Sequence, residues 1–117
     1  MNKRKYDVII WGFTGFTGFL VAEYYLKKYG VNTDLKWAVG GRNKEKLEDA
    51  LLKLGNTSID IIVADSHDSK SLNAMVKKTK VIISTVGPYA KYGTELVAAC
   101  VNNGTDYCDL AGESQWI

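Results

Sequence analysis

Short apolar runs alternate along this chain with longer stretches in which apolar positions recur every three or four residues. The runs are rich in β-branched residues, which is typical of parallel strands covered on both faces. The stretches between them predict amphipathic helices. The expected strands cover residues 8–11, 35–39, 59–64, 81–86 and 105–110, and the expected helices cover residues 17–29, 44–54, 69–78 and 92–103.

Five strands alternating with four helices predict an α/β fold. Right-handed crossovers, together with a glycine turn directly after the first strand, imply a doubly wound, Rossmann-like parallel sheet with the strand order 3-2-1-4-5. No internal repeat, low-complexity tract or linker interrupts the pattern. We therefore expect residues 1–117 to form one domain.

Each expected helix has one apolar face that we expect to pack on the sheet. For the tyrosines of the first helix, core packing is favoured over a platform for a ligand. The predicted faces are Leu20, Val21, Tyr24 and Tyr25; Leu47, Ala50, Leu51 and Leu54; Leu72, Met75 and Val76; and Leu96, Val97, Cys100 and Val101.

Three glycines at intervals of three residues follow the first strand directly. Gly12 is expected to allow a tight turn, Gly15 to leave room for a diphosphate, and Gly18 to let the helix pack close to the strand. The helix start also directs unpaired N–H groups and the positive end of the helix dipole at one spot, which favours a phosphate. The predicted contacts are Gly12, Phe13, Thr14, Gly15, Phe16, Thr17 and Gly18. A purely structural glycine turn is the alternative.

Arg42 follows the second expected strand, at the position that faces the adenosine ribose in a dinucleotide fold. An acidic residue there selects NAD, and this turn has none. A guanidinium can instead grip a 2′-phosphate with two hydrogen bonds, which predicts selection of NADP. Such a contact of about 1.5–3 kcal/mol corresponds to a preference of roughly tenfold to a hundredfold. The alternative is an arginine that caps or solvates the next helix.

Asp65 comes just after the third expected strand. In this architecture the position lies near the adenine, so Asp65 could accept a hydrogen bond from the amino group of the base. It could equally cap the N-terminus of the following helix, as could Asp68 or Ser69.

The fourth expected strand ends in Gly87, Pro88 and Tyr89, which face the nicotinamide side of the cleft in a doubly wound sheet. Gly87 would let the backbone approach the cofactor, and Pro88 would fix the turn. Tyr89 and Tyr92 either contact the nicotinamide ribose or a substrate, or pack within the loop.

The composition, with 46% hydrophobic and 24% charged residues, is that of a globular protein. A net charge of +2 is too small to indicate a nucleic-acid or membrane-surface partner. The basic start, Lys3, Arg4 and Lys5, is interpreted as a solvated lead-in to the first strand. No apolar stretch approaches the length of a membrane span, and no cysteine or histidine spacing predicts a metal site. Cys100 and Cys108 indicate a reducing compartment, the cytoplasm, and no disulfide framework.

Four segments carry a resemblance to a known family: W-G-F-T-G-F-T-G at 11–18, G-G-R-N at 40–43, S-T-V-G-P-Y at 84–89 and Y-C-D-L-A-G-E at 107–113. The chain resembles the N-terminal cofactor-binding domain of saccharopine dehydrogenase-like oxidoreductases, a family that includes trans-acting enoyl reductases. The glycine motif alone is shared with extended short-chain reductases and NmrA-like sensors, whereas the last two segments are more distinctive. Phe13 stands where the family favours alanine, and we expect its ring to lie beside the phosphates and narrow the site.

The resemblance implies an NADP(H)-binding domain that positions the nicotinamide for hydride transfer to or from an unidentified substrate. Family members continue into a second domain that helps to form the substrate site, so we expect this chain to be a fragment or a shortened form. A homodimer or the missing segment would then cover its open surface.

No residue is predicted to be catalytic. The Tyr-x-x-x-Lys pair of short-chain reductases is not present in its usual context, and Tyr92, Asp109 and Glu113 lie at strand ends on the cleft side. The alternative functions are an NmrA-like redox sensor that binds NADP without catalysis, and a scaffold domain that no longer binds a cofactor.

Overall fold

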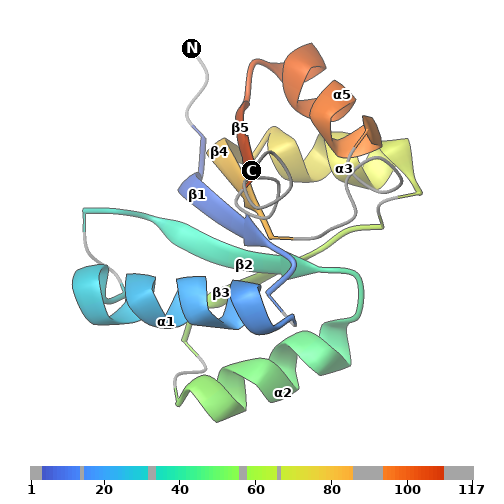
Figure 1. Ribbon diagram of the computed structural model, residues 1–117. Coiled ribbons are helices and arrows are strands. Elements are labelled where there is room, and N and C mark those ends of the chain that lie inside the picture. The colour runs from blue at the N-terminus through green and yellow to red at the C-terminus, as the bar shows by residue number, and fades with distance from the viewer. Residues whose placement is uncertain are drawn as a thin grey trace, which may run out of the picture.

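The computed structural model describes residues 4–13, 15–31, 34–55, 58–65, 67–85 and 94–109. Within these ranges the chain forms one sheet of five parallel strands in the order β3-β2-β1-β4-β5 (Figure 1). The strands are β1 (Tyr6–Trp11), β2 (Trp37–Gly41), β3 (Asp60–Val63), β4 (Thr79–Ser84) and β5 (Asp106–Asp109). The helices are α1 (Phe16–Tyr29), α2 (Lys44–Leu54), α3 (Ser69–Val76) and α5 (Thr94–Asn103). The predicted Rossmann-like fold and strand order are confirmed.

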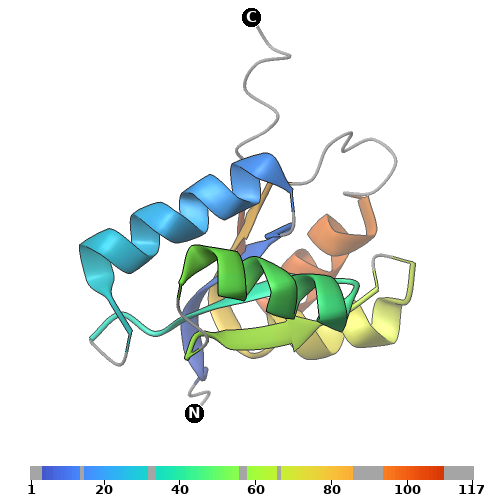
Figure 2. The same cartoon turned by 90° about the horizontal axis from the view of Figure 1, so that it is seen from below.

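The sheet is covered on both faces. Helices α1 and α2 lie on one face, and α3 and α5 lie on the other (Figures 1 and 2). Neighbouring residues Ile9 and Ile10 of β1 are both fully buried, and each belongs to a different core cluster. A central strand buried on both faces has no polar side to present, which explains its uninterrupted apolar sequence.

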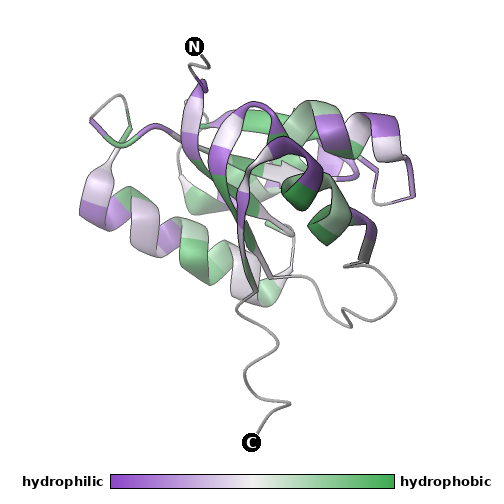
Figure 3. Ribbon diagram, turned by 90° about the horizontal axis from the view of Figure 1, so that it is seen from above, coloured by the Kyte–Doolittle hydropathy of each residue, from purple (hydrophilic) through white to green (hydrophobic). Residues whose placement is uncertain are grey.

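Helices α2 and α3 bury the faces predicted for them, whereas α1 is rotated from its predicted position. Leu20 and Tyr24 are 45% and 56% exposed, so their predicted core packing is wrong. The most deeply buried residues of α1 are instead Gly18 and Ala22. These small residues let the helix approach β1 closely. Val21 and Tyr25 are partly buried against the core as predicted, and Phe19 and Leu26 pack there as well. Figure 3 shows hydrophobic and hydrophilic residues alternating along the helices, because successive residues of a helix point to different faces.

Helix α5 shows a similar difference. Leu96 and Cys100 are buried as predicted, but Val97 and Val101 are 36% and 74% exposed. Ala99 takes the predicted inward place and is buried. The inward face therefore follows the spacing of residues 96, 99 and 100, and the apolar character of the two valines was misleading.

Arg4 is not a solvated lead-in, so this prediction is wrong. Its half-buried guanidinium donates hydrogen bonds to the carbonyl oxygens of Val76, Thr79 and Asn103 at 2.9, 2.9 and 2.6 Å. It also donates to Thr105 Oγ1 at 2.6 Å. Val76 and Asn103 end α3 and α5, where unpaired carbonyls carry the negative end of the helix dipole. Arg4 therefore ties two helix ends to the beginning of the sheet.

Three further features follow from the described ranges. No helix in them is both long and apolar enough to cross a lipid bilayer. They also bring together no group of three or more histidine, cysteine, aspartate or glutamate side chains that could hold a metal ion. Both cysteines carry free thiols, Cys100 buried and Cys108 exposed.

Candidate functional site

The turn after β1 has the tight geometry predicted for it. Gly12 has a φ of 92°, a conformation that favours glycine. The N–H groups of Gly12 and Phe13 donate to the carbonyl of Gly40 at 3.0 and 3.3 Å, and the N–H of Gly15 donates to the Gly12 carbonyl at 3.0 Å. These three amides are satisfied inside the protein. The amides of Gly12, Phe13 and Gly15 are therefore not available to a phosphate, and only the amides after Gly15 remain as candidate donors.

The free amides lie at the start of α1. Gly15 is the N-cap and offers no side-chain cap, and the first helical hydrogen bond runs from Phe19 N–H to the Gly15 carbonyl at 2.9 Å. The N–H groups of Phe16, Thr17 and Gly18 have no acceptor in the described part of the chain. The first turn also contains no acidic residue. This helix end therefore has the donors and the dipole that bind an anion.

Gly18 and Gly15 have different surroundings. A Cβ atom on Gly18 would overlap the carbonyl group of Gly12 and lie 2.9 Å from Phe13 Cα. The predicted close packing of Gly18 against the end of the strand is confirmed. A Cβ atom on Gly15 would meet only the Gly12 carbonyl oxygen, at an ordinary 3.5 Å. Gly15 is exposed, so the bare backbone there faces open space.

The ring of Phe13 does not lie beside the phosphate position, and that expectation is wrong. Phe13 is fully buried and stacks on Phe19, with ring centroids 5.9 Å apart and an interplanar angle of 14°. The ring is drawn into the core beneath α1 and α2 because the turn directs it inward. Phe16, the first residue of α1, is 81% exposed instead.

Arg42 lies directly after β2 and is exposed. It does not cap α2, because Asn43 is the N-cap and its Oδ1 accepts from Lys46 N–H at 3.1 Å. The described residues place no carboxylate within ion-pair distance of its guanidinium. Arg42 is thus a cation at the carboxyl edge of the sheet with no ion-pair partner among the described residues, where an anionic ligand can reach it.

Strand β2 extends beyond its predicted end at residue 39. Gly40 and Gly41 are buried strand residues, and a Cβ atom on Gly40 would lie 3.1 Å from the Trp11 ring. A Cβ atom on Gly41 would lie 3.0 Å from a methyl group of Leu47. Glycine suits these two strand positions because large side chains from β1 and α2 occupy the space where a Cβ atom would lie.

Asp65 lies just after β3, as predicted, and its Oδ1 accepts from His67 N–H at 2.9 Å. The N-cap of α3 is Asp68, whose Oδ1 accepts from Lys70 N–H at 3.1 Å. The alternative that Asp65 or Ser69 caps this helix is therefore wrong. No further hydrogen bond to the Asp65 carboxylate is found within the described ranges.

Thr85 is a residue of this site that the sequence analysis did not single out. Its N–H donates to the Trp11 carbonyl at 3.0 Å, and its hydroxyl shares its one proton between the carbonyls of Trp11 and Gly12, at 3.0 and 3.2 Å from Oγ1. The available signal was its place in the segment S-T-V-G-P-Y at 84–89, which carries part of the family resemblance. The predicted residues Thr14, Gly87, Pro88, Tyr89, Tyr92 and Glu113, and the side chain of Asp109, lie outside what the structure describes.

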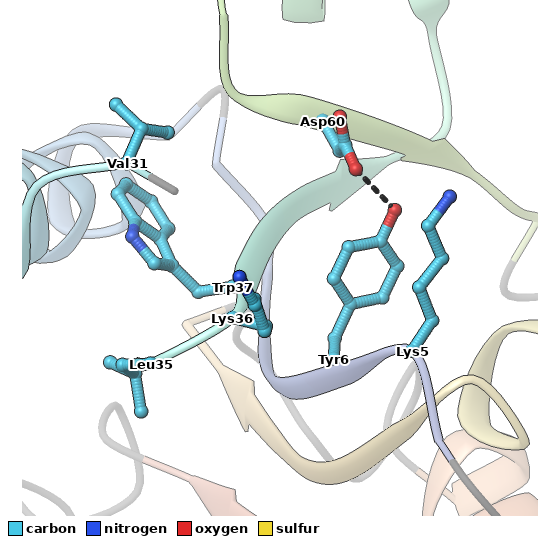
Figure 4. A pocket seen from close by; sticks show the side chains of 7 residues that line it. All are labelled: Lys5, Tyr6, Val31, Leu35, Lys36, Trp37 and Asp60. Carbon is cyan, nitrogen blue, oxygen red and sulfur yellow. Dashed lines mark hydrogen bonds between the residues drawn. The ribbon is translucent and has the colours of Figure 1, made fainter. Parts of the chain in front are cut away.

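A hollow of about 290 Å³ lies at the other edge of the sheet, at the amino ends of β1 to β3 (Figure 4). Tyr6 donates from its hydroxyl to Asp60 Oδ2 at 2.7 Å, and burial together with this carboxylate raises the pKa of Tyr6. The polar groups thus satisfy each other, and Lys5 and Lys36 at the rim are exposed. Ligands of open α/β sheets bind at the carboxyl ends of the strands, so this hollow is not the dinucleotide site.

The family described as the saccharopine dehydrogenase NADP binding domain matches residues 8–116 of this chain. The chain belongs to this family. It is 41% identical over 114 residues to the trans-acting enoyl reductase of Mycobacterium leprae, and 40% identical over 119 residues to a lipid droplet localized protein of Caenorhabditis elegans. The two alignments cover 96% and 97% of this chain but 27% and 28% of the relatives.

The apo saccharopine dehydrogenase (L-Glu forming) of Saccharomyces cerevisiae shares the fold over 89% of this chain and 21% of its own length. Its TM-score is 0.68 at 20% sequence identity. The resemblance recognised in the sequence is therefore confirmed, and the chain is an NADP-binding domain of the saccharopine dehydrogenase family. The sensor and scaffold alternatives are not favoured, because the matching family model describes the NADP binding domain of a dehydrogenase.

Proposed function

We propose that this chain holds NADP(H) for an oxidoreductase, in which hydride passes between the nicotinamide and a substrate bound largely by a further domain. The observation that supports this most is the start of α1, where the amides of Phe16, Thr17 and Gly18 find no acceptor among the described residues and lie beside open backbone at Gly15. Three converging N–H groups and the helix dipole suit a diphosphate. The family assignment is independent of this geometry and names the same cofactor.

The remaining predicted residues divide into those that shape the turn and those proposed to contact the cofactor. Gly12 and Phe13 shape the turn through their hydrogen bonds to β2, and Asp65 faces the adenine with the carboxylate oxygen that His67 does not use. Thr14 completes the glycine segment, and Gly87, Pro88 and Tyr89 are assigned to the nicotinamide side.

Arg42 is proposed to select NADP over NAD. It is exposed, unpaired within the described ranges and next to the last residue of β2. A 2′-phosphate would give this guanidinium a charge-assisted partner, whereas a 2′-hydroxyl would not. The capping role that competed with this interpretation is filled by Asn43.

Binding itself is tested by thermal unfolding and calorimetric titration with NADPH, with NADH and without ligand. NADPH at 100 times its dissociation constant should stabilise the fold by about 2.7 kcal/mol. No stabilisation and no heat of binding at millimolar NADPH would refute the proposal and favour the scaffold alternative.

Selectivity is tested with Arg42→Ala. We expect NADPH affinity to fall roughly tenfold to a hundredfold, and NADH affinity to change little. Lys44→Ala is the matched control, because Lys44 is an exposed cation that begins α2 two residues further on. Equal losses for both cofactors in Arg42→Ala, or an equal effect of Lys44→Ala, would contradict the assigned role.

Catalysis is tested on a longer product of the same gene, where one exists, because the chain covers only 27% of its Mycobacterium leprae relative. NADPH oxidation is followed with enoyl, imine and carbonyl substrates. Enoyl compounds are tested first, because that relative is named an enoyl reductase. Tight NADPH binding without turnover across the panel would favour the sensor.

We also propose that a second copy or a further domain covers the outer face of α1. Phe16, Leu20 and Tyr24 are exposed at intervals of four residues, which forms an apolar stripe. A cytoplasmic location is proposed from the free thiols of Cys100 and Cys108. Light scattering after size exclusion distinguishes a dimer from a monomer.

A further inference from the structure

Thr85 links the end of β4 to the turn that precedes the diphosphate site. Its backbone N–H continues the ladder between β4 and β1 by donating to the Trp11 carbonyl at 3.0 Å. Its hydroxyl lies 3.0 Å from the same carbonyl oxygen and 3.2 Å from that of Gly12. A single side chain from the central region of the sheet thus reaches both carbonyls at which the chain leaves β1.

The peptide between Gly12 and Phe13 is held from two strands at once. Its N–H, on Phe13, donates to Gly40 of β2, and its carbonyl, on Gly12, accepts from Thr85 and from Gly15 N–H. Gly12 adopts its left-handed conformation, with φ 92°, between these two anchors. The orientation of this peptide sets where α1 begins, because the Gly12 carbonyl is bonded to the N-cap residue.

We propose that Thr85 is a positioning residue for the cofactor diphosphate, which it influences through the Gly12 carbonyl without touching the ligand. This inference depends on the proposed binding of NADP(H) at the start of α1. The three amides belong to one helical turn, so a rotation of that turn worsens the hydrogen-bond angles of all three phosphate contacts together. A preorganised turn avoids the cost of ordering these amides during binding.

Thr85→Val isolates the hydroxyl, because valine keeps the β-branched shape and the backbone N–H. The Trp11 carbonyl retains the N–H of residue 85, and the Gly12 carbonyl retains the N–H of Gly15. Neither oxygen is left without a partner, so the variant is expected to fold. Thr85→Ser restores the hydroxyl and serves as the rescue variant.

The experiment measures affinities for NADPH and for adenosine 2′-monophosphate, which carries the group assigned to Arg42 but no diphosphate. In Thr85→Val we expect NADPH to bind about tenfold more weakly and the mononucleotide to bind as it does to wild type. Thr85→Ser should return NADPH affinity to within about threefold of wild type.

The outcomes separate this inference from the function on which it depends. If the wild type does not bind NADPH, the proposed function fails. If the wild type binds NADPH but Thr85→Val binds it equally well, only the role of Thr85 is refuted. A parallel loss of both ligands, or a folded Thr85→Ser that is not rescued, also refutes positioning through the hydroxyl.

Discussion

Replacing Gly18 with alanine sets helix propensity against packing, and the structure indicates which of them dominates. Gly18 is the third residue of α1 and is buried. An added Cβ atom would overlap the Gly12 carbonyl group and lie 2.9 Å from Phe13 Cα. All of these are backbone atoms, so no side chain can rotate away. The helix or the turn itself would have to move.

The two effects have opposite signs. Alanine is favoured over glycine inside a helix by about 0.8–1.0 kcal/mol. Inserting a methyl group into a packed region costs about 1–3 kcal/mol, and contact with rigid backbone places this case at the upper end or above it. We therefore expect Gly18→Ala to be less stable than wild type by about 2 kcal/mol. NADPH binding should weaken as well, because the displaced turn carries the phosphate donors.

The assay is urea unfolding followed by the fluorescence of the buried residues Trp11 and Trp37. With an m-value of about 2 kcal/mol/M, the midpoint should fall by about 1 M. Gly15→Ala is the matched control, since its Cβ atom would have only an ordinary 3.5 Å contact with the Gly12 carbonyl. This control should lose at most about 1 kcal/mol, the usual range for an N-cap change, but it should lose NADPH affinity because its methyl group fills the diphosphate space.

Equal or greater stability of Gly18→Ala would refute the packing argument, because propensity alone would then describe the position. Unchanged NADPH affinity in Gly15→Ala would contradict the assignment of open backbone at Gly15 to the diphosphate. The pair of variants therefore tests the structural and ligand-binding roles of the two glycines separately.

Two other predictions concern groups far from the phosphate site. Arg4→Lys keeps the charge, but a lysine cannot reach the four acceptors of Arg4, so urea unfolding should show a loss of about 2–4 kcal/mol of stability. The control Lys70→Ala, at an exposed position, should lose less than about 0.5 kcal/mol. Similar losses in the two variants would argue against a role for the guanidinium network. Burial raises the pKa of Cys100 from its ordinary 9.0 to about 11 in the folded protein. The folded state therefore favours the neutral thiol. This contribution to stability is complete below pH 9 and is lost as the pH rises toward 11. At pH 8 a thiol reagent should therefore modify exposed Cys108 rapidly and Cys100 only after denaturation; rapid modification of both in the folded protein would contradict the burial of Cys100.

The parts of the site that could be predicted are those in which a local pattern has one physical solution. A glycine that leaves a strand for a helix at once requires a tight turn, and Gly12 has it. Gly18 was placed correctly because a helix that starts so soon must pass close to its own strand. Arg42 was identified because it is the only charge in the turn after the second strand.

Other features depend on neighbours far along the chain. Whether the ring of Phe13 enters the core or the phosphate site depends on Phe19 and on the space beneath α2. In the sequence Arg4 is one of three adjacent basic residues near the N-terminus. Its four hydrogen-bond partners lie more than 70 residues away along the chain. Thr85 likewise bonds to carbonyls 73 and 74 positions earlier. No local pattern could reveal these contacts.

The sequence by itself determined the strand order and the position of the glycine turn, because hydrophobic periodicity and glycine spacing act over a few residues. The tertiary structure alone decided which amides remain free, which face of α1 is buried and which side chains brace the turn. These properties depend on backbone groups brought together from separate strands, and a hydrogen bond between them is specified only once the sheet has formed.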